Sequence, residues 1–221
     1  MLDRGKRYLQ IAFNDSIHDV NRVLPQIPFD ERILIEAGTP FIKREGQRGI
    51  SHIAGMWSGP IIADIKTMDG AVEEVQEAAA AGAGGATVLG AASKETIDLF
   101  IKTCKQYNLI SVIDMINVDD PLRVLLRLKD RPDVVELHMG RDEETTRGNM
   151  IEYRHIRRIR SKYDVIISAA GGVDLNAAHS AVFNGAQIVV VNIVEPDDPW
   201  KGIKSTDEVR NIAIEFLKAV K

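Results

Sequence analysis

The sequence predicts an α/β protein, a (β/α)8 TIM barrel that forms one domain over residues 1–221. Eight short apolar runs alternate along the chain with segments of helical character. Many of these runs are apolar over their whole length, which is typical of buried parallel strands. No stretch rich in proline, glycine and serine divides the chain, and 45% hydrophobic content over 221 residues can form one sizeable core. The number and alternation of the runs favour a closed barrel over a doubly wound sheet.

The first half of the chain alternates strand and helix, and several helices have recognisable starts. Ser16 and Ser93 are residues that cap helix N-termini, and apolar residues recur at helical spacing between positions 97 and 104. Glycines interrupt the segment Phe41–Trp57, which we interpret as a broken helix plus a loop. The expected strands are Tyr8–Phe13, Arg32–Ile35, Pro60–Ile65 and Gly85–Leu89, and the other expected helices are Ser16–Gln26, Ala71–Ala81 and Ser93–Tyr107.

The second half continues the alternation, with two longer connections. Gly140–Asn149 is a polar loop before a helix, and Asn192–Lys204 is predicted to be a loop after the last strand. The expected strands are Leu109–Met115, Val134–Leu137, Val165–Ala169 and Ile188–Val191, and the expected helices are Pro121–Lys129, Met150–Lys162, Leu175–Asn184 and Asp207–Val220.

The composition narrows the functional classes. The net charge is −4 without a cationic block, so neither nucleic acid nor an anionic membrane surface is an expected partner. Cys104 is the only cysteine, which excludes an intramolecular disulfide and fits a reducing cytosol. The first ten residues hold no apolar stretch of signal-peptide length, and no run is long enough to cross a membrane. We therefore expect a soluble, cytoplasmic protein.

Polar residues collect at the carboxyl ends of the predicted strands. In a barrel, the loops that follow the strands build the active site at this end. Scattered surface charges would not coincide with strand ends so often. The residues concerned are Asn14, Asp15, Glu36, Asp64, Lys66, Asp114 and His138.

The most informative stretch is residues 61–70, which read IIADIKTMDG. Side chains two apart in a strand share a face, so Asp64 and Lys66 point the same way. Asp69 lies just past the strand and either folds back toward this pair or reaches a neighbouring chain. A lysine between carboxylates stays protonated, and such a group suits the stabilisation of an oxyanion such as an enolate. The alternative interpretation of the motif is a surface salt bridge.

Several segments together resemble the orotidine-5′-phosphate decarboxylase suprafamily, and most closely its branch of 3-hexulose-6-phosphate synthases and 3-keto-L-gulonate-6-phosphate decarboxylases. The segments occur in family order between residues 9 and 173. They are LQIA at 9–12, IEAGTP at 35–40, ADIKTMD at 63–69, LGAA at 89–92, DMIN at 114–117, LHMG at 137–140 and AGG at 170–172.

The resemblance implies a homodimeric barrel with active sites near the subunit interface. It implies Mg2+ bound by Glu36 and Asp64, where the metal would hold both oxygens of a 1,2-enediolate derived from a sugar phosphate. Lys66 would neutralise this enediolate, and Asp69, from the same or the partner chain, would hold Lys66 in place. The reaction would be the aldol addition of formaldehyde to ribulose 5-phosphate, or its reverse.

The resemblance also assigns residues to the two ends of the substrate. His138, with Arg141 nearby, would serve the formaldehyde end as a hydrogen-bond donor or proton shuttle. The other substrate-binding residues implied are Asn14, Glu36, Gly171, Gly172 and Asn192.

Two departures from the family pattern leave alternatives open. Asn14 stands where members usually have an aspartate, and Val191–Trp200 replaces the Gly-Gly or Gly-Arg that usually completes the phosphate site. Only the Gly171-Gly172 half of that site is recognisable. Either the phosphate is held differently, or the chain acts on another substrate, as a decarboxylase or as a lyase on a differently phosphorylated or non-phosphorylated compound. A barrel that lost catalysis is a further alternative.

Overall fold

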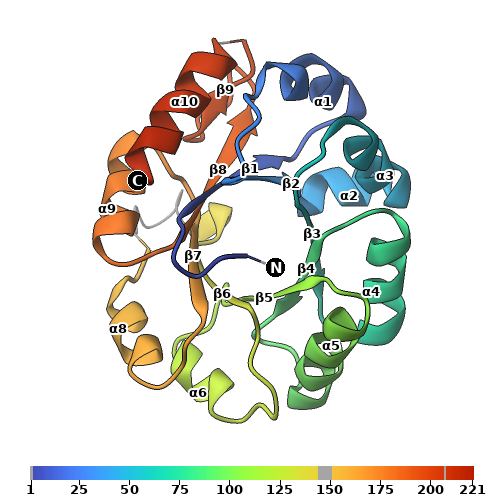
Figure 1. Cartoon of the computed structure of the whole chain (residues 1–221), viewed down its shortest axis with the longest axis vertical. Helices are drawn as coiled ribbons and strands as arrows, with labels where there is room; N and C mark the ends of the chain where they lie inside the picture. Colours follow the sequence, from blue (N-terminus) through green and yellow to red (C-terminus); the bar gives the residue numbers. More distant parts are fainter. Residues whose placement is uncertain (1, 144–150, 207) are drawn as a thin grey trace.

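The computed structural model describes residues 2–143, 151–206 and 208–221. Eight parallel strands pair in sequence order, and β1 also pairs with β8, which closes the sheet into a barrel (Figure 1). The predicted (β/α)8 fold is therefore confirmed. The barrel strands are β1 Tyr8–Phe13, β2 Ile33–Ala37, β3 Ile61–Thr67, β4 Gly85–Leu89, β5 Ile110–Asp114, β6 Val134–His138, β7 Ile166–Ala170 and β8 Ile188–Val194.

Helices surround the strands on the outside of the barrel (Figure 1). As predicted, Ser16 and Ser93 cap the helices that follow them, each accepting a hydrogen bond from a backbone N–H three residues on. The elements are α1 Ile17–Val23, the short 3-10 helix η1 Leu24–Gln26, α2 Thr39–Glu45, α3 Gln47–Met56, α4 Ala71–Ala80, α5 Lys94–Gln106, α6 Pro121–Leu125, α8 Arg154–Arg160, α9 Leu175–Phe183 and α10 Val209–Ala219.

Strand alternation divides the buried residues into two sets. One set packs between the strands and the helices and forms the larger core. The other set faces the barrel interior and occupies every second strand position, as in Tyr8 and Ala12, Leu34, and Val134. Polar residues at the same alternate positions, such as Gln10 and Glu36, also face the interior. The fold therefore directs these polar groups into the barrel without any contribution from the loops.

Several predicted boundaries differ from the structure. The broken helix in 41–57 is confirmed, because Gly46 at φ 62° separates α2 from α3. Helices α6, α8 and α10 are each shorter than predicted. Residues 141–143 are helical rather than loop. The rest of the predicted loop up to Asn149 and the predicted helix starts at Met150 and Asp207 lie outside the described residues.

The prediction for the last strand is wrong at its end. We expected a loop from Asn192, but β8 continues to Val194, and the short strand β9 Ile203–Lys204 pairs with it in parallel. The β-branched Ile193 and Val194 favour the extended conformation, and their partners in β9 lie ten residues further along the chain. Asn192 is therefore a strand residue with a fixed direction. In the part of the chain that the structure describes, no helix has the length and apolar character needed to cross a membrane.

Candidate active site

The carboxyl ends of the strands surround a cavity of about 240 Å³. The cavity brings together residues from seven of the barrel's strands or the segments that follow them. It is lined by every predicted site residue except Asp69, namely Asn14, Glu36, Asp64, Lys66, His138, Arg141, Gly171, Gly172 and Asn192. Five of the strand-end residues noted in the sequence, Asn14, Glu36, Asp64, Lys66 and His138, therefore converge on one place.

Lys66 lies between two carboxylates. Its Nζ is 3.1 Å from Asp64 Oδ2 and also donates a hydrogen bond to Asp114 Oδ2. Burial opposes the lysine's charge, but Asp64, Asp114 and then Glu136 outweigh this effect and raise the pKa of Lys66 well above its usual value. The ammonium is therefore a permanent positive charge in the cavity wall, and it cannot serve as a base.

Asp64 is held by two threonine hydroxyls. Thr39 Oγ1 donates to Asp64 Oδ2 at 2.7 Å, and Thr87 Oγ1 donates to Asp64 Oδ1 at 2.8 Å. Neither threonine was among the sequence-predicted site residues, although Thr39 belongs to the IEAGTP segment. With one hydroxyl on each oxygen, the carboxylate has a fixed orientation toward Lys66.

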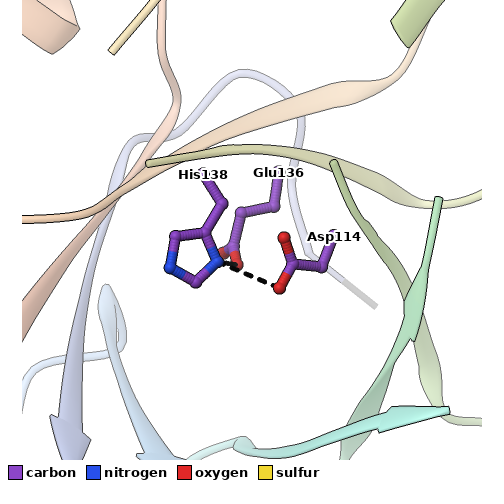
Figure 2. A group of neighbouring side chains, drawn as sticks. All are labelled: Asp114, Glu136 and His138. Atoms are coloured by element: carbon purple, nitrogen blue, oxygen red, sulfur yellow. Dashed lines mark hydrogen bonds and ion pairs between the residues drawn. The ribbon is translucent and has the colours of Figure 1, made fainter. Parts of the chain in front are cut away.

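Asp114 joins Lys66 to a second group of side chains (Figure 2). The Asp114 side chain is fully buried, and His138 Nδ1 lies 2.9 Å from its Oδ2. Glu136 Oε1 is 3.7 Å from the same histidine nitrogen, and Ser168 donates a hydrogen bond of 2.9 Å to the other Glu136 oxygen. Figure 2 shows the three side chains of Asp114, Glu136 and His138 directed toward one another inside the barrel. The cavity thus contains one continuous charged network.

This network shifts the pKa values of its members in opposite directions. Burial disfavours the His138 cation, but the charge and hydrogen bond of Asp114 raise the pKa of His138 to about 9. Burial likewise disfavours the Asp114 anion, but His138 and Lys66 hold the pKa of Asp114 well below its usual range. Near neutral pH, His138 therefore carries two ring protons. Asp114 contacts only Nδ1, and His138 itself lines the cavity.

Two further carboxyl groups lie deeper in the barrel. Burial, followed by the charges of Asp64 and Glu136, raises the pKa of Glu36 to about 8. Burial and the charge of Asp114 raise the pKa of Glu136 to about 7. Gln10 donates a hydrogen bond to Glu36 and opposes part of the effect. The interior therefore holds more carboxyl groups than Lys66 and His138 can neutralise, and the deeper carboxyl groups hold their protons to higher pH than usual.

The residues present fit a divalent cation at the predicted ligands. Glu36 and Asp64 both line the cavity, and their mutual repulsion is part of what raises the pKa of Glu36. A cation between them would relieve that repulsion, and carboxylate oxygens are the ligands that Mg2+ prefers. Binding of Mg2+ by this pair stays a prediction.

A second set of possible metal ligands is less suitable. Asp114, Glu136 and His138 offer three ligand atoms within 4.8 Å of one another. However, the Lys66 ammonium and the protonated His138 Nδ1 already contact Asp114. Positive charge therefore already balances this cluster, and we interpret it as a hydrogen-bonded network rather than a metal site.

The other side of the cavity is built from backbone and from neutral or paired side chains. Gly171 and Gly172 adopt φ values of 111° and 54°, and a Cβ on Gly171 would lie 2.4 Å from the Met139 carbonyl oxygen. Asn14 Nδ2 donates a hydrogen bond of 3.0 Å to Asn192 Oδ1, so the residue that departs from the family pattern contacts the extended part of β8.

Arg141 and the segment between β8 and β9 complete this side. The Arg141 guanidinium carbon lies 4.7 Å from the centre of the Trp200 ring, which is a cation–π arrangement. Trp200 and the next residue, Lys201, both line the cavity. The segment that replaces the expected glycine loop therefore forms part of the cavity wall.

Asp69 is exposed and lies outside the cavity. Among the described residues it has no hydrogen bond or ion pair with Lys66, and Asp114 occupies the position at Lys66 that we assigned to Asp69. A role for Asp69 within its own chain is not supported by this arrangement. Its donation to a partner chain stays a prediction.

Sequence reasoning missed Glu136, Thr87 and Gln10 as parts of the network. A signal for Glu136 was available, because it lies two residues before His138 in a strand and so shares its face. The other three residues of 134–137 are apolar, and they conceal that the direction of the one carboxylate matters. The pairing of Lys66 with Asp114 had no comparable signal, since it joins β3 to β5 across the barrel interior.

Comparisons with known proteins agree with the sequence resemblance. A model of the Orotidine 5'-phosphate decarboxylase / HUMPS family matches residues 8–199. The Bifunctional enzyme Fae/Hps of Methanothrix thermoacetophila is 35% identical over 216 residues, which are 97% of this chain and 53% of that protein. The protein of the same name from Methanosarcina barkeri is 37% identical over 218 residues, which are 96% of this chain and 52% of that protein. The chain spans about half the length of these curated relatives.

Solved structures give the same result for the fold. The 3-hexulose-6-phosphate synthase from Salmonella typhimurium has a TM-score of 0.80 and 25% identity, with 96% of this chain and 98% of that chain covered. A second 3-hexulose-6-phosphate synthase structure has a TM-score of 0.77 and 27% identity, with 97% of this chain and all of that chain covered.

Proposed function

The chain belongs to the Orotidine 5'-phosphate decarboxylase / HUMPS family, and on this premise we propose that it is an aldehyde-lyase. The proposed reaction interconverts D-arabino-3-hexulose 6-phosphate with D-ribulose 5-phosphate and formaldehyde. The observation that carries the proposal is the Lys66 ammonium, fixed between Asp64 and Asp114 in the cavity wall. The relatives whose names include Hps and the two synthase structures support this choice of reaction.

In the cleavage direction, the substrate's C1 hydroxyl gives up its proton to solvent water, which later returns a proton to His138, and the C1–C2 bond breaks. Formaldehyde leaves, and the bonding electrons pass to C2 and the C3 oxygen as a 1,2-enediolate of ribulose 5-phosphate. Lys66 stabilises this developing negative charge because it stays protonated. His138, which is cationic near neutral pH, supplies the proton that C2 requires. The synthetic direction reverses each transfer.

We propose Mg2+ as the cofactor, held by Glu36 and Asp64. When bound, it would supply additional positive charge for the enediolate oxygens. Thr39 and Thr87 orient Asp64 for this task as well as for Lys66. Gln10, which donates to Glu36, fixes the other predicted ligand.

The proposed function also includes a phosphate site, a formaldehyde site and a partner subunit. The backbone N–H groups of Gly171 and Gly172 would donate hydrogen bonds to the substrate phosphate, and Arg141 would lie at the formaldehyde end with His138. The protein would work as a homodimer in the cytoplasm, and Asp69 would approach Lys66 of the partner chain. The exposure of Asp69 in the single chain is compatible with that arrangement.

The test is formaldehyde release from D-arabino-3-hexulose 6-phosphate, with and without Mg2+, in wild type and Lys66→Ala. We expect Mg2+-dependent release that falls by about 10²–10³-fold in the variant, the effect of removing one group that stabilises an oxyanion. Lys94→Ala is the matched control, since Lys94 pairs with Asp98 on the outer helix α5. Activity of Lys66→Ala equal to that of wild type would contradict the mechanism.

A second candidate function is a family member with an altered substrate. The Asn14–Asn192 hydrogen bond favours it, because Asn14 stands where the family usually has an aspartate and is here a neutral amide bonded to a second amide. A decarboxylase acting on 3-keto-L-gulonate 6-phosphate is one such possibility. If the folded protein releases no formaldehyde, carbon dioxide release from that compound is the next assay.

A further inference from the structure

Strand β3 is irregular at the point where it carries Asp64 and Lys66. Its pairing with β4 runs through Ile62 and Ala63 opposite Gly85 and Ala86, and then resumes only at Thr67 opposite Val88. Three residues of β3 therefore face a single residue of β4, Thr87. This is a β-bulge larger than the usual one-residue insertion.

The bulge forces an unusual backbone conformation on Lys66. Its φ is 48°, in the left-handed region, which a lysine adopts rarely. The regular sheet hydrogen bond is also lost for the Lys66 N–H, because β4 offers no backbone partner in register there. Regular strand alternation predicted that Asp64 and Lys66 meet, but the structure reaches this result through a bulge that needs its own support.

Thr87 supplies that support. Its Oγ1 accepts a hydrogen bond of 2.9 Å from the Lys66 backbone N–H and donates one of 2.8 Å to Asp64 Oδ1. Thr87 is 2% exposed, so both bonds are shielded from solvent. The donor and an acceptor site of one hydroxyl are both used within the bulge, and the β-branched side chain restricts the rotation of the hydroxyl about χ1.

We infer that Thr87 is a positioning residue that holds Asp64 and Lys66 in their reactive arrangement. Thr87 acts through both Asp64 and Lys66. Thr39, in contrast, donates only to Asp64, to its carboxylate and its backbone carbonyl oxygen. The test of this inference by kcat rests on the proposed function, whereas the test by hydrogen exchange of the Lys66 amide does not. A valine at position 87 keeps the shape and loses both hydrogen bonds.

The experiment compares Thr87→Val, Thr87→Ser and the control Thr103→Val. Thr103 is also buried, at 3% exposure, but its hydroxyl bonds to a carbonyl within helix α5. In Thr87→Val we expect kcat to fall by about 10–100-fold with KM changed less than about threefold, because small misplacements of catalytic groups have effects of this size. Thr87→Ser keeps the hydroxyl and should stay within about threefold of wild-type kcat.

Amide hydrogen exchange of Lys66 gives the second readout. Loss of its hydrogen bond to Thr87 should accelerate exchange by about tenfold in Thr87→Val and leave it near wild type in Thr87→Ser and Thr103→Val. This measurement does not depend on enzyme activity. If the wild type releases no formaldehyde, the proposed function fails, but the exchange rates still test the role of Thr87.

Three results would overturn the inference: kcat of Thr87→Val within about twofold of wild type, an equal loss in Thr87→Ser and Thr87→Val, or unchanged Lys66 exchange in Thr87→Val. If Thr87→Val does not fold, Thr87→Ala takes its place in the same comparison with Thr87→Ser. Thr103→Val separates these effects from the general cost of a buried Thr→Val change, because it should alter stability without altering kcat.

Discussion

The two sides of the cavity are built differently. On the side of β3, β5 and β6, charged side chains contact one another directly, as Lys66, Asp114 and His138 do. On the side of β7 and β8, backbone at Gly171-Gly172 and the Asn14–Asn192 amide pair form the wall. The first side determines the charges of the proposed catalytic groups, and the second side determines the shape of the substrate-binding surface. A change on the first side should therefore reduce kcat, and a change on the second should alter substrate affinity or stability.

The largest effect should come from Asp114→Asn. This change removes the carboxylate shared by Lys66 and His138, and we expect kcat to fall by about 10²–10³-fold. Without the negative charge, the pKa of His138 should fall from about 9, so the alkaline limb of the pH–rate profile should move to lower pH.

Asp98→Asn is the control for this prediction, since Asp98 pairs with Lys94 on the outer helix α5. It should keep wild-type kcat and an unchanged profile. A pH profile of Asp114→Asn that coincides with that of wild type would show that Asp114 does not set the protonation of His138.

The charged side could be predicted from the sequence in large part. Asp64, Lys66 and His138 were identified because strand ends and alternate positions are properties of local sequence. The contact of Lys66 with Asp114 could not be, since it depends on how the closed barrel places β5 relative to β3. The bulge in β3 was equally hidden, because it depends on a threonine in the neighbouring strand.

The opposite side was predicted less well, and for a different physical reason. The sequence predicts that the eighth strand ends at Val191 and that a loop begins at Asn192. In a barrel, a polar residue at an alternate position can face the interior while the strand continues, as Glu136 also does in β6. Pairing with β9, ten residues away, then extends β8 to Val194. The local sequence around Asn192 does not predict this pairing.

Glu36→Gln should change how stability depends on pH. The pKa of Glu36 is raised from 4.5 to about 8, so the folded protein keeps a proton that the unfolded chain releases. The resulting stabilisation is fully present below the unfolded pKa of 4.5 and is lost as the pH rises to about 8. Between about pH 5 and pH 8, without divalent cations, the free energy of unfolding of wild type should therefore fall by about 1–3 kcal/mol relative to Glu36→Gln.

Urea unfolding at several pH values measures this difference. The exposed Glu73→Gln is the control and should follow the wild-type curve. Added Mg2+ should restore stability at the higher pH in wild type and not in Glu36→Gln, because the cation would bind the ionised carboxylate. Parallel curves for wild type and Glu36→Gln would argue against an interior proton on Glu36.

On the opposite side, Gly171→Ala should reduce stability and substrate affinity. Gly171 has a φ of 111°, and the added Cβ would lie 2.4 Å from the Met139 carbonyl oxygen. We expect a loss of about 1–3 kcal/mol in the free energy of unfolding and a higher KM, because the backbone N–H groups proposed to bind phosphate would move.

Gly55→Ala is the matched control for this glycine, since Gly55 is within helix α3 and its added Cβ would meet nothing within 4 Å beyond its chain neighbours and the backbone of its own helix. It should be neutral or slightly stabilising. Thermal unfolding and KM of the two variants decide the prediction, and equal values for both would contradict it.

The smallest effect on stability should come from Lys201→Ala. Lys201 Nζ is 3.1 Å from Asp174 Oδ2, with the two side chains 53% and 42% exposed, and such pairs contribute about 0–1 kcal/mol. Lys201 nevertheless lines the same cavity as Gly171 and Gly172, so its charge should favour a phosphorylated substrate. We expect KM to rise about three- to tenfold with kcat unchanged, and the rise to shrink at high salt as screening weakens the attraction.

Because Lys218 on helix α10 does not line the cavity, Lys218→Ala should leave KM unchanged. If Lys201→Ala behaves in the same way, the segment between β8 and β9 does not contribute to phosphate recognition.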